Sequence, residues 1–230
     1  GGGDNDIGAL TIDGGDSSSA LDLNGDITSA GIITFQNFSG INIDASAART
    51  ITSGGNLTSS GVAIQLDNGS STVTLTNGTS DGDIALGAIT DDATGGTAAD
   101  LTITSSGDVT LSTVALNDTT DGDLIVTVDS DDNDAEAETL TLGGAITDVA
   151  LITLSGGYSS DSDDIIDIGA NLTTGGAITI ADADSVKIDA SAARTITSGG
   201  AITVTSNIDG ILLDNGSSTV TLTNGTSDGD

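Results

Sequence analysis

The chain of 230 residues contains no cysteine, histidine, methionine, proline or tryptophan, and its aromatic residues are one tyrosine and two phenylalanines. Without histidine and cysteine, the ligand sets usual for zinc, copper, haem and iron–sulfur centres cannot form. Catalytic triads that need either residue are excluded, and disulfide bonds cannot form. The shortage of aromatic residues also disfavours a compact β-sandwich, whose core usually holds buried tryptophan or tyrosine.

Positive charge is almost absent. Three basic residues stand against 35 acidic ones, which gives a formal net charge of −32. Glutamate occurs only at Glu136 and Glu138, so the acidity comes almost entirely from aspartate. Nucleic-acid binding is excluded, because it depends on neutralising phosphates with lysine and arginine. The sequence also has no apolar run of membrane-spanning length.

The hydrophobic residues of the sequence are arranged in short runs. Hydrophobic residues make up 36% of the chain and its mean hydropathy is +0.13. In the segment Thr72–Thr76, Val73 and Leu75 alternate with threonines, as in a half-buried β-strand. Similar runs are separated by Asn-Gly, Gly-Gly and Asp-Gly pairs, which are typical of turns. Because a disordered acidic chain would be poor in β-branched residues, we predict a folded, nearly all-β protein.

Long internal repeats divide the chain. The segment Ile43–Gly55 recurs unchanged at Ile188–Gly200, and Leu66–Asp83 recurs unchanged at Leu213–Asp230. We therefore expect the chain to be a window from a longer repetitive protein. Its expected parts are a first partial repeat unit at 1–83, the remainder of the unit at 84–142, and a matching partial unit at 143–230.

A finer repeat indicates the architecture. A small residue, any residue, then Ile or Leu, then Thr recurs at Gly25–Thr28, Gly55–Thr58 and Gly87–Thr90. Spacings of about 20–30 residues fit one coil of a solenoid. We predict an all-β, parallel β-solenoid (β-helix) with short strands and Gly/Asp/Asn-rich turns, in which aliphatic residues stack on themselves in thin layers. The alternative is a row of tandem β-sandwich domains.

The strand starts also carry a resemblance. Gly55-Asn56-Leu57-Thr58, Gly144-Ala145-Ile146-Thr147 and Gly107-Asp108-Val109-Thr110 resemble the repeats of filamentous-haemagglutinin-type exoproteins and autotransporter passengers. That resemblance implies a large secreted bacterial β-helix with an extracellular, cell-surface location. It also implies adhesive or structural work, with cell-surface glycans or other cells as partners. A solenoid coil has unpaired backbone groups at its ends, which favours end-to-end or lateral assembly with further copies.

Aspartate clusters are the sharpest chemical feature of the sequence. Carboxylates cap turns, and they are also the preferred ligands of Ca²⁺, which takes six to eight oxygens. Equivalent aspartates in adjacent coils would repel one another unless a cation bridges them or salt screens them. Plain solvated turns are the alternative interpretation. The candidate Ca²⁺ ligands are Asp81, Asp83, Asp121, Asp123, Asp129, Asp131, Asp134, Asp161, Asp163, Asp164, Asp228 and Asp230.

Two other motifs have mainly structural interpretations. Arg49 and Arg194 occupy the same position in the two copies, and we predict that each forms an ion pair with a neighbouring aspartate. Thr-x-Thr recurs several times, as at Thr50/Thr52. Threonine is a good outward-facing strand residue, although aligned ranks of threonine are also what β-helical ice-binding proteins present. Because the motifs are not spaced at one coil period, we interpret them as ordinary strand residues.

These observations favour a structural protein and not an enzyme. The expected function is an extracellular repeat protein that forms a surface fibre, sheath or adhesin stalk from stacked coils. Ca²⁺ is the only cofactor that the residues suggest. A calcium-dependent cell adhesin is the first alternative, and a polysaccharide-active β-helix enzyme is the second.

Overall fold

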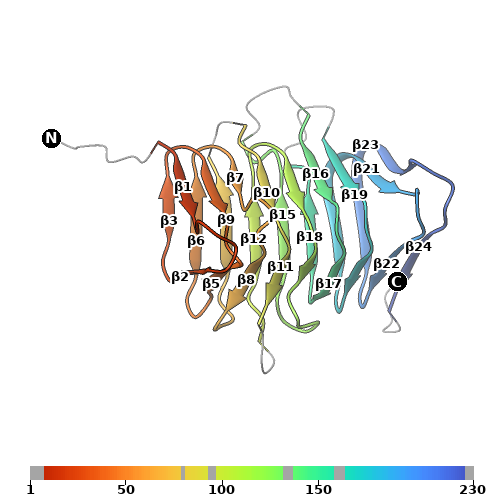
Figure 1. The fold of residues 1–230 in the computed structure, drawn as a ribbon. Helices are drawn as coiled ribbons and strands as arrows, with labels where there is room; N and C mark the ends of the chain where they lie inside the picture. Colours follow the sequence, from red (N-terminus) through yellow and green to blue (C-terminus); the bar gives the residue numbers. More distant parts are fainter. Residues whose placement is uncertain (1–7, 79–80, 93–96, 132–136, 158–163, 226–230) are drawn as a thin grey trace.

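The computed structural model describes residues 8–78, 81–92, 97–131, 137–157 and 164–225. Over these residues the chain winds as a β-solenoid of about eight turns (Figure 1). The described part contains no helix, and hence no helix that could cross a membrane. Each coil has three short strands, which we assign to three faces of the solenoid in chain order.

Face 1 contains the first strand of each coil. Its strands are β1 (Leu10–Asp13), β4 (Ile33–Gln36), β7 (Leu57–Thr58), β10 (Ile84–Leu86), β13 (Val109–Leu111), β16 (Thr139–Leu142) and β19 (Ile165–Ile168). The face continues in the second half of β21 (Ile178–Asp189), which pairs with β19. Its last member is the end of β23 (Ile202–Asp214), which pairs with that half of β21.

Face 2 is a separate sheet of nine strands. Its strands are β2 (Ala20–Leu23), β5 (Gly40–Asp44), β8 (Ile64–Asp67), β11 (Ile89–Asp91), β14 (Val114–Ala115), β17 (Ile146–Val149), β20 (Leu172–Thr174), β22 (Arg194–Ser198) and β24 (Val220–Asn224). Its outward side chains include the aspartates and asparagines that are described with the candidate site.

Face 3 closes each coil. Its strands are β3 (Ile27–Ser29), β6 (Arg49–Ser53), β9 (Val73–Asn77), β12 (Leu101–Thr104), β15 (Leu124–Thr127) and β18 (Ile152–Ser155). The first half of β21 pairs with β18 and extends this face. Because β21 and β23 run through the corner, faces 1 and 3 form one continuous sheet of 15 strands.

All pairings between the described strands are parallel. This confirms the predicted solenoid, because sandwich domains are built from antiparallel strands. Alternate residues point inward and stack on their equivalents, as Ile33 does on Leu57 and Ile84 on Val109. The result is a continuous aliphatic core without a single tryptophan.

Asparagine shapes several corners. Asn37, Asn68, Asn117 and Asn215 have φ between 57° and 62°, a left-handed conformation that asparagine adopts more easily than most residues. Gly69 is required for space as well, because a Cβ there would collide with the backbone of Ala45 in the preceding coil. The turn signals in the sequence therefore do mark the corners of the coil.

The identical repeats do not occupy identical places. Segment 49–53 forms β6 on face 3, whereas its exact copy 194–198 forms β22 on face 2. Coils also differ in length: Ile166 stacks on Val186, 20 residues later, whereas Val109 stacks on Leu140, 31 residues later. The interval of 145 residues between copies is therefore not a whole number of turns, and the second copy begins one face earlier in its coil.

The copies also differ in burial. Leu66 and Leu75 are 0% and 1% exposed, but their copies Leu213 and Leu222 are 61% and 50% exposed. The earlier pair is covered by the coils on both sides. No further coil lies over the later pair within the described residues, so stacking of coils, and not the local sequence, decides the burial.

Candidate metal centre

Buried polar side chains follow the edge at which face 3 ends and the next coil begins on face 1. In the N-terminal coils the buried side chains at this 3–1 edge are neutral. Ser53 Oγ lies 3.0 Å from the Gly31 carbonyl oxygen. The Asn77 amide donates to Ser105 Oγ at 2.8 Å, and the Ser106 N–H donates to Asn77 Oδ1 at 2.7 Å. We call Ser53, Asn77 and Ser105 the neutral corner, in which donors and acceptors match.

The same edge becomes acidic farther along the solenoid. Asp129 follows β15 with a φ of 45°, Glu138 directly precedes β16, and Asp164 directly precedes β19. These three residues, here called the acidic corner, are only 4%, 5% and 2% exposed. One carboxylate oxygen from each lies within 4.8 Å of the others. Segments far apart in sequence meet because each ends or begins a strand at this edge.

The surroundings of Asp164 in the acidic corner disfavour its ionised form. Burial is the main cause that raises the pKa of Asp164 to about 6, and the negative charges of Asp129 and Asp184 raise it further. The Glu138 N–H, which donates to Asp164 Oδ1 at 3.2 Å, opposes the rise. In the next coil, Asp184 accepts a hydrogen bond from the Asp164 N–H at 3.1 Å.

The three basic residues of the chain are engaged elsewhere. Arg49 pairs with Asp44 at 2.9 Å, and Arg194 pairs with Asp189 at 2.7 Å. These contacts confirm the predicted ion pairs. Lys187 lies on face 1, where its charge lowers the pKa of Asp167 against the larger effect of burial. No basic group is among the causes that shift the pKa of Asp164.

The candidate ligands from the sequence are distributed over several edges. Asp81 and Asp83 are exposed and precede β10 on face 1, whereas Asp121 and Asp123 are half-buried and precede β15 on face 3. The two Asp-Gly-Asp segments therefore lie at different edges and do not stack. Asp123 instead stacks near Asp100, whose carboxylate accepts the Asp123 N–H at 3.0 Å.

Only Asp129 and Asp164, of the twelve predicted ligands, are brought together by the described structure. Asp131 is half-buried two residues beyond Asp129. The predicted ligands Asp134, Asp161, Asp163, Asp228 and Asp230 lie outside the described residues. Glu138 is not among the ligands predicted from the sequence. Its signal was its place directly before an alternating strand, which is also the place of Asp83 and Asp108.

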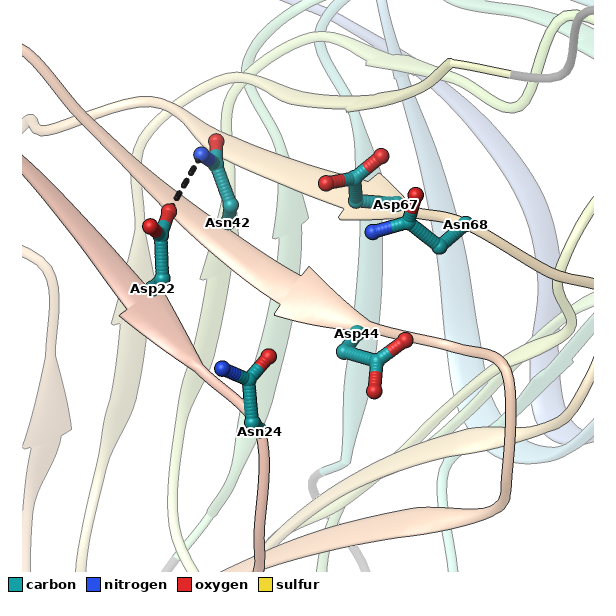
Figure 2. A pocket seen from close by; sticks show the side chains of 6 residues that line it. All are labelled: Asp22, Asn24, Asn42, Asp44, Asp67 and Asn68. Carbon is teal, nitrogen blue, oxygen red and sulfur yellow. Dashed lines mark hydrogen bonds between the residues drawn. The ribbon is translucent and has the colours of Figure 1, made fainter.

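A second acidic surface lies on face 2 and is open to solvent. Figure 2 shows Asp22, Asn42, Asp44 and Asp67 on three neighbouring strands, around a shallow depression of about 260 Å³. The Asn42 amide donates to Asp22, its partner in register, at 2.7 Å (Figure 2), whereas Asp44 pairs directly with Asp67. Alternation of amide and carboxylate is one way in which stacked aspartates are tolerated here.

Threonines stack on the outer side of face 3. Thr50 pairs with Thr74 and Thr52 with Thr76, and the next strand continues both columns with Thr102 and Thr104. The expectation that the Thr-x-Thr motifs lack the coil period is therefore wrong for these three motifs. Unequal corner lengths hid the period in the sequence.

Comparison with protein-family models, curated proteins and solved structures finds no match to this chain.

Proposed function

We propose that this chain is a structural segment of an extracellular repeat protein: the rod of a surface fibre, sheath or adhesin stalk. The single observation that carries the proposal is the parallel ladder that continues over all three faces for about eight turns. Along the solenoid axis, each coil is held to the next by backbone hydrogen bonds and a column of aliphatic side chains. Such a rod gains length by adding coils and needs no new type of contact.

Surface chemistry supports the same proposal. Most aspartates of the described residues are exposed or half-buried, and a net charge of −32 keeps such rods soluble and apart. The lack of histidine and cysteine, together with the resemblance to bacterial exoproteins, supports a non-enzymatic role at the cell surface. Ca²⁺ adhesion and polysaccharide cleavage are the functions against which this proposal is tested.

Immunogold electron microscopy of the source cells, with antibody raised against this chain, tests the proposal. We expect label on extended surface structures, and loss of the label after brief protease treatment of intact cells. Label confined to the cell interior would overturn the extracellular rod. Release of reducing sugar ends from acidic glycans by the purified chain would instead support an enzyme.

An ice-binding surface is a second candidate function, and one observation favours it. We call Thr50, Thr52, Thr74, Thr76, Thr102 and Thr104 the threonine array. In a chain with 33 aspartates, this array of two columns and three rows contains no charge. Neighbouring rows are about 4.8 Å apart and the columns about 6.8 Å apart. A regular lattice of hydroxyl and methyl groups with such spacings resembles the lattice of water on a plane of ice.

An ice-recrystallisation assay tests this second candidate. We expect the chain to inhibit recrystallisation and Thr74→Lys, at the centre of the array, to lose most of that inhibition. Thr110→Lys adds the same charge to an exposed position of β13 on face 1 and should retain it. Equal behaviour of the two variants, or no inhibition by the unmodified chain, would reject the candidate.

A further inference from the structure

We propose that the acidic corner is a buried Ca²⁺ site in which Asp129, Glu138 and Asp164 each supply a carboxylate oxygen. The site does not depend on the proposed function, because it follows from side chains that are already together. Oxygens that share one Ca²⁺, each about 2.4 Å from the ion, can lie at most about 4.8 Å apart. The three carboxylates meet that condition in place.

Burial favours a bound cation at this corner. A carboxylate that is removed from water needs hydrogen-bond donors or a positive charge. Asp164 is 2% exposed, and its Oδ1 accepts the Glu138 N–H. Its Oδ2 is buried and, within the described ranges, accepts no hydrogen bond. One oxygen of Asp164 lies within 4.8 Å of carboxylate oxygens of Asp129 and Glu138, which offer no positive charge.

Neither arginine of the chain balances the charge of the acidic corner. Arginine is bound to aspartate at other corners, at Asp44 and Asp189. A divalent cation supplies the missing charge and occupies the space between the oxygens.

The donor set selects Ca²⁺ among the common ions. All three ligands are hard carboxylate oxygens, and the chain has no thiolate or imidazole to favour a transition metal. Mg²⁺ requires a strict octahedron and retains several waters, which suits an open surface better than a buried corner. Ca²⁺ accepts irregular sets of six to eight oxygens. Bound there, it would tie the coil that begins at β16 to the coil that begins at β19.

Isothermal titration of the chelator-treated chain with CaCl₂, in about 0.15 M KCl to screen the surface charge, tests the site. We expect one saturable site above weak, diffuse binding. Asp164→Asn and Glu138→Gln should each weaken this site about ten-fold or more, since each removes one charged ligand. Asp148→Asn, an exposed position with the same loss of charge, should leave it unchanged.

Thermal melting separates a metal site from a merely structural aspartate. Without Ca²⁺, Asp164→Asn should melt at a higher temperature than the unmodified chain, because it relieves repulsion. With Ca²⁺, the unmodified chain should gain stability, whereas the variant should gain little. The inference is overturned if Asp164→Asn and Asp148→Asn bind Ca²⁺ alike, or if Ca²⁺ stabilises all variants equally. MgCl₂ in place of CaCl₂ should give no saturable site; equal binding of both ions would overturn the assignment to Ca²⁺.

Discussion

The neutral and acidic corners occupy the same edge of one solenoid, a few coils apart, but the polar groups that they bury differ in charge and in hydrogen bonding. Both are buried, and both lie where face 3 passes into face 1. In the neutral corner, Asn77 and Ser105 hydrogen-bond across coils with matched donors and acceptors. In the acidic corner, carboxylate oxygens of Asp129, Glu138 and Asp164 lie within 4.8 Å of one another, and the Glu138 N–H donates to only one oxygen of Asp164. The same edge of this solenoid thus buries either an amide network whose donors and acceptors match or a group of carboxylates for which we propose a bound cation.

Moving a charge into the neutral corner should have the largest effect. Asn77→Asp keeps the shape but removes the amide that donates to Ser105 and to the Gly82 carbonyl. We expect a loss of about 3 kcal/mol in the free energy of unfolding, as for a buried charge without a partner. Urea denaturation measures it.

The charge swap has its own control. Asp164→Asn changes the same two residue types in the opposite direction, and without Ca²⁺ it should stabilise the fold. Added Ca²⁺ should not restore Asn77→Asp, because the buried side chains that Asn77 contacts, Ser105 and Ser106, supply no carboxylate. If both variants lose the same free energy of unfolding, the two corners do not differ in how they tolerate a carboxylate.

A smaller effect tests whether a corner depends on its edge. Ser53 and Ser198 are equivalent residues of the identical repeats, both 0% exposed, but they lie at different edges. Their hydroxyl groups lie 3.0 Å and 2.7 Å from the carbonyl oxygens of Gly31 and Gly176. Each serine-to-alanine change should cost about 1–2 kcal/mol, because a buried carbonyl loses its donor. Matching urea midpoints would show that the corner is a local unit, and clearly unequal ones would show that the edge matters.

The smallest effect concerns a half-buried carboxylate of face 2, that of Asp67. A hydrogen bond shared with Asp92 is the main cause that raises the pKa of Asp67, followed by burial and the Asp92 charge. A raised pKa means that stability is lost as the pH rises through it. Asp67→Asn should therefore melt slightly higher than the unmodified chain at pH 7, and the difference should vanish well below pH 3.8, the ordinary value.

Asp13, whose pKa is lowered, should show a dependence of stability on pH opposite to that of Asp67. A hydrogen bond from Asn37, then those from Gly15 and Gln36, lowers its pKa. Its stabilising effect is present above the ordinary pKa and is lost as the pH falls through the lowered one. Asp13→Asn should consequently melt lower at pH 7. If both variants shift in one direction, the surface carboxylates act only through net charge.

Much of the fold was readable in the sequence. The alternation around Val73 and Leu75 placed both side chains inside, where they are 0% and 1% exposed. Asn-Gly and Asp-Gly pairs marked corners of the coil. The lack of tryptophan correctly disfavoured β-sandwich domains. The ion pairs of Arg49 and Arg194 were predictable because each joins residues only five positions apart in the chain.

The site was predicted only in part, for one physical reason. Which side chains stack depends on the length of every intervening corner, and these lengths vary between coils. The two Asp-Gly-Asp segments therefore separated to different edges, the threonines aligned unexpectedly, and Glu138 joined two aspartates from other segments. Spacing in sequence carried no reliable information about these columns.

By itself the sequence determined the local pattern: which residues alternate, where the chain turns, and how acidic the surface is. Such properties depend on nearest neighbours along the chain, so identical repeats form strands and corners of the same kind. The tertiary structure alone decided which face each repeat occupies, which leucines are covered, and which carboxylates share a corner. Those outcomes depend on contacts between coils, where one added corner residue shifts the path of everything after it.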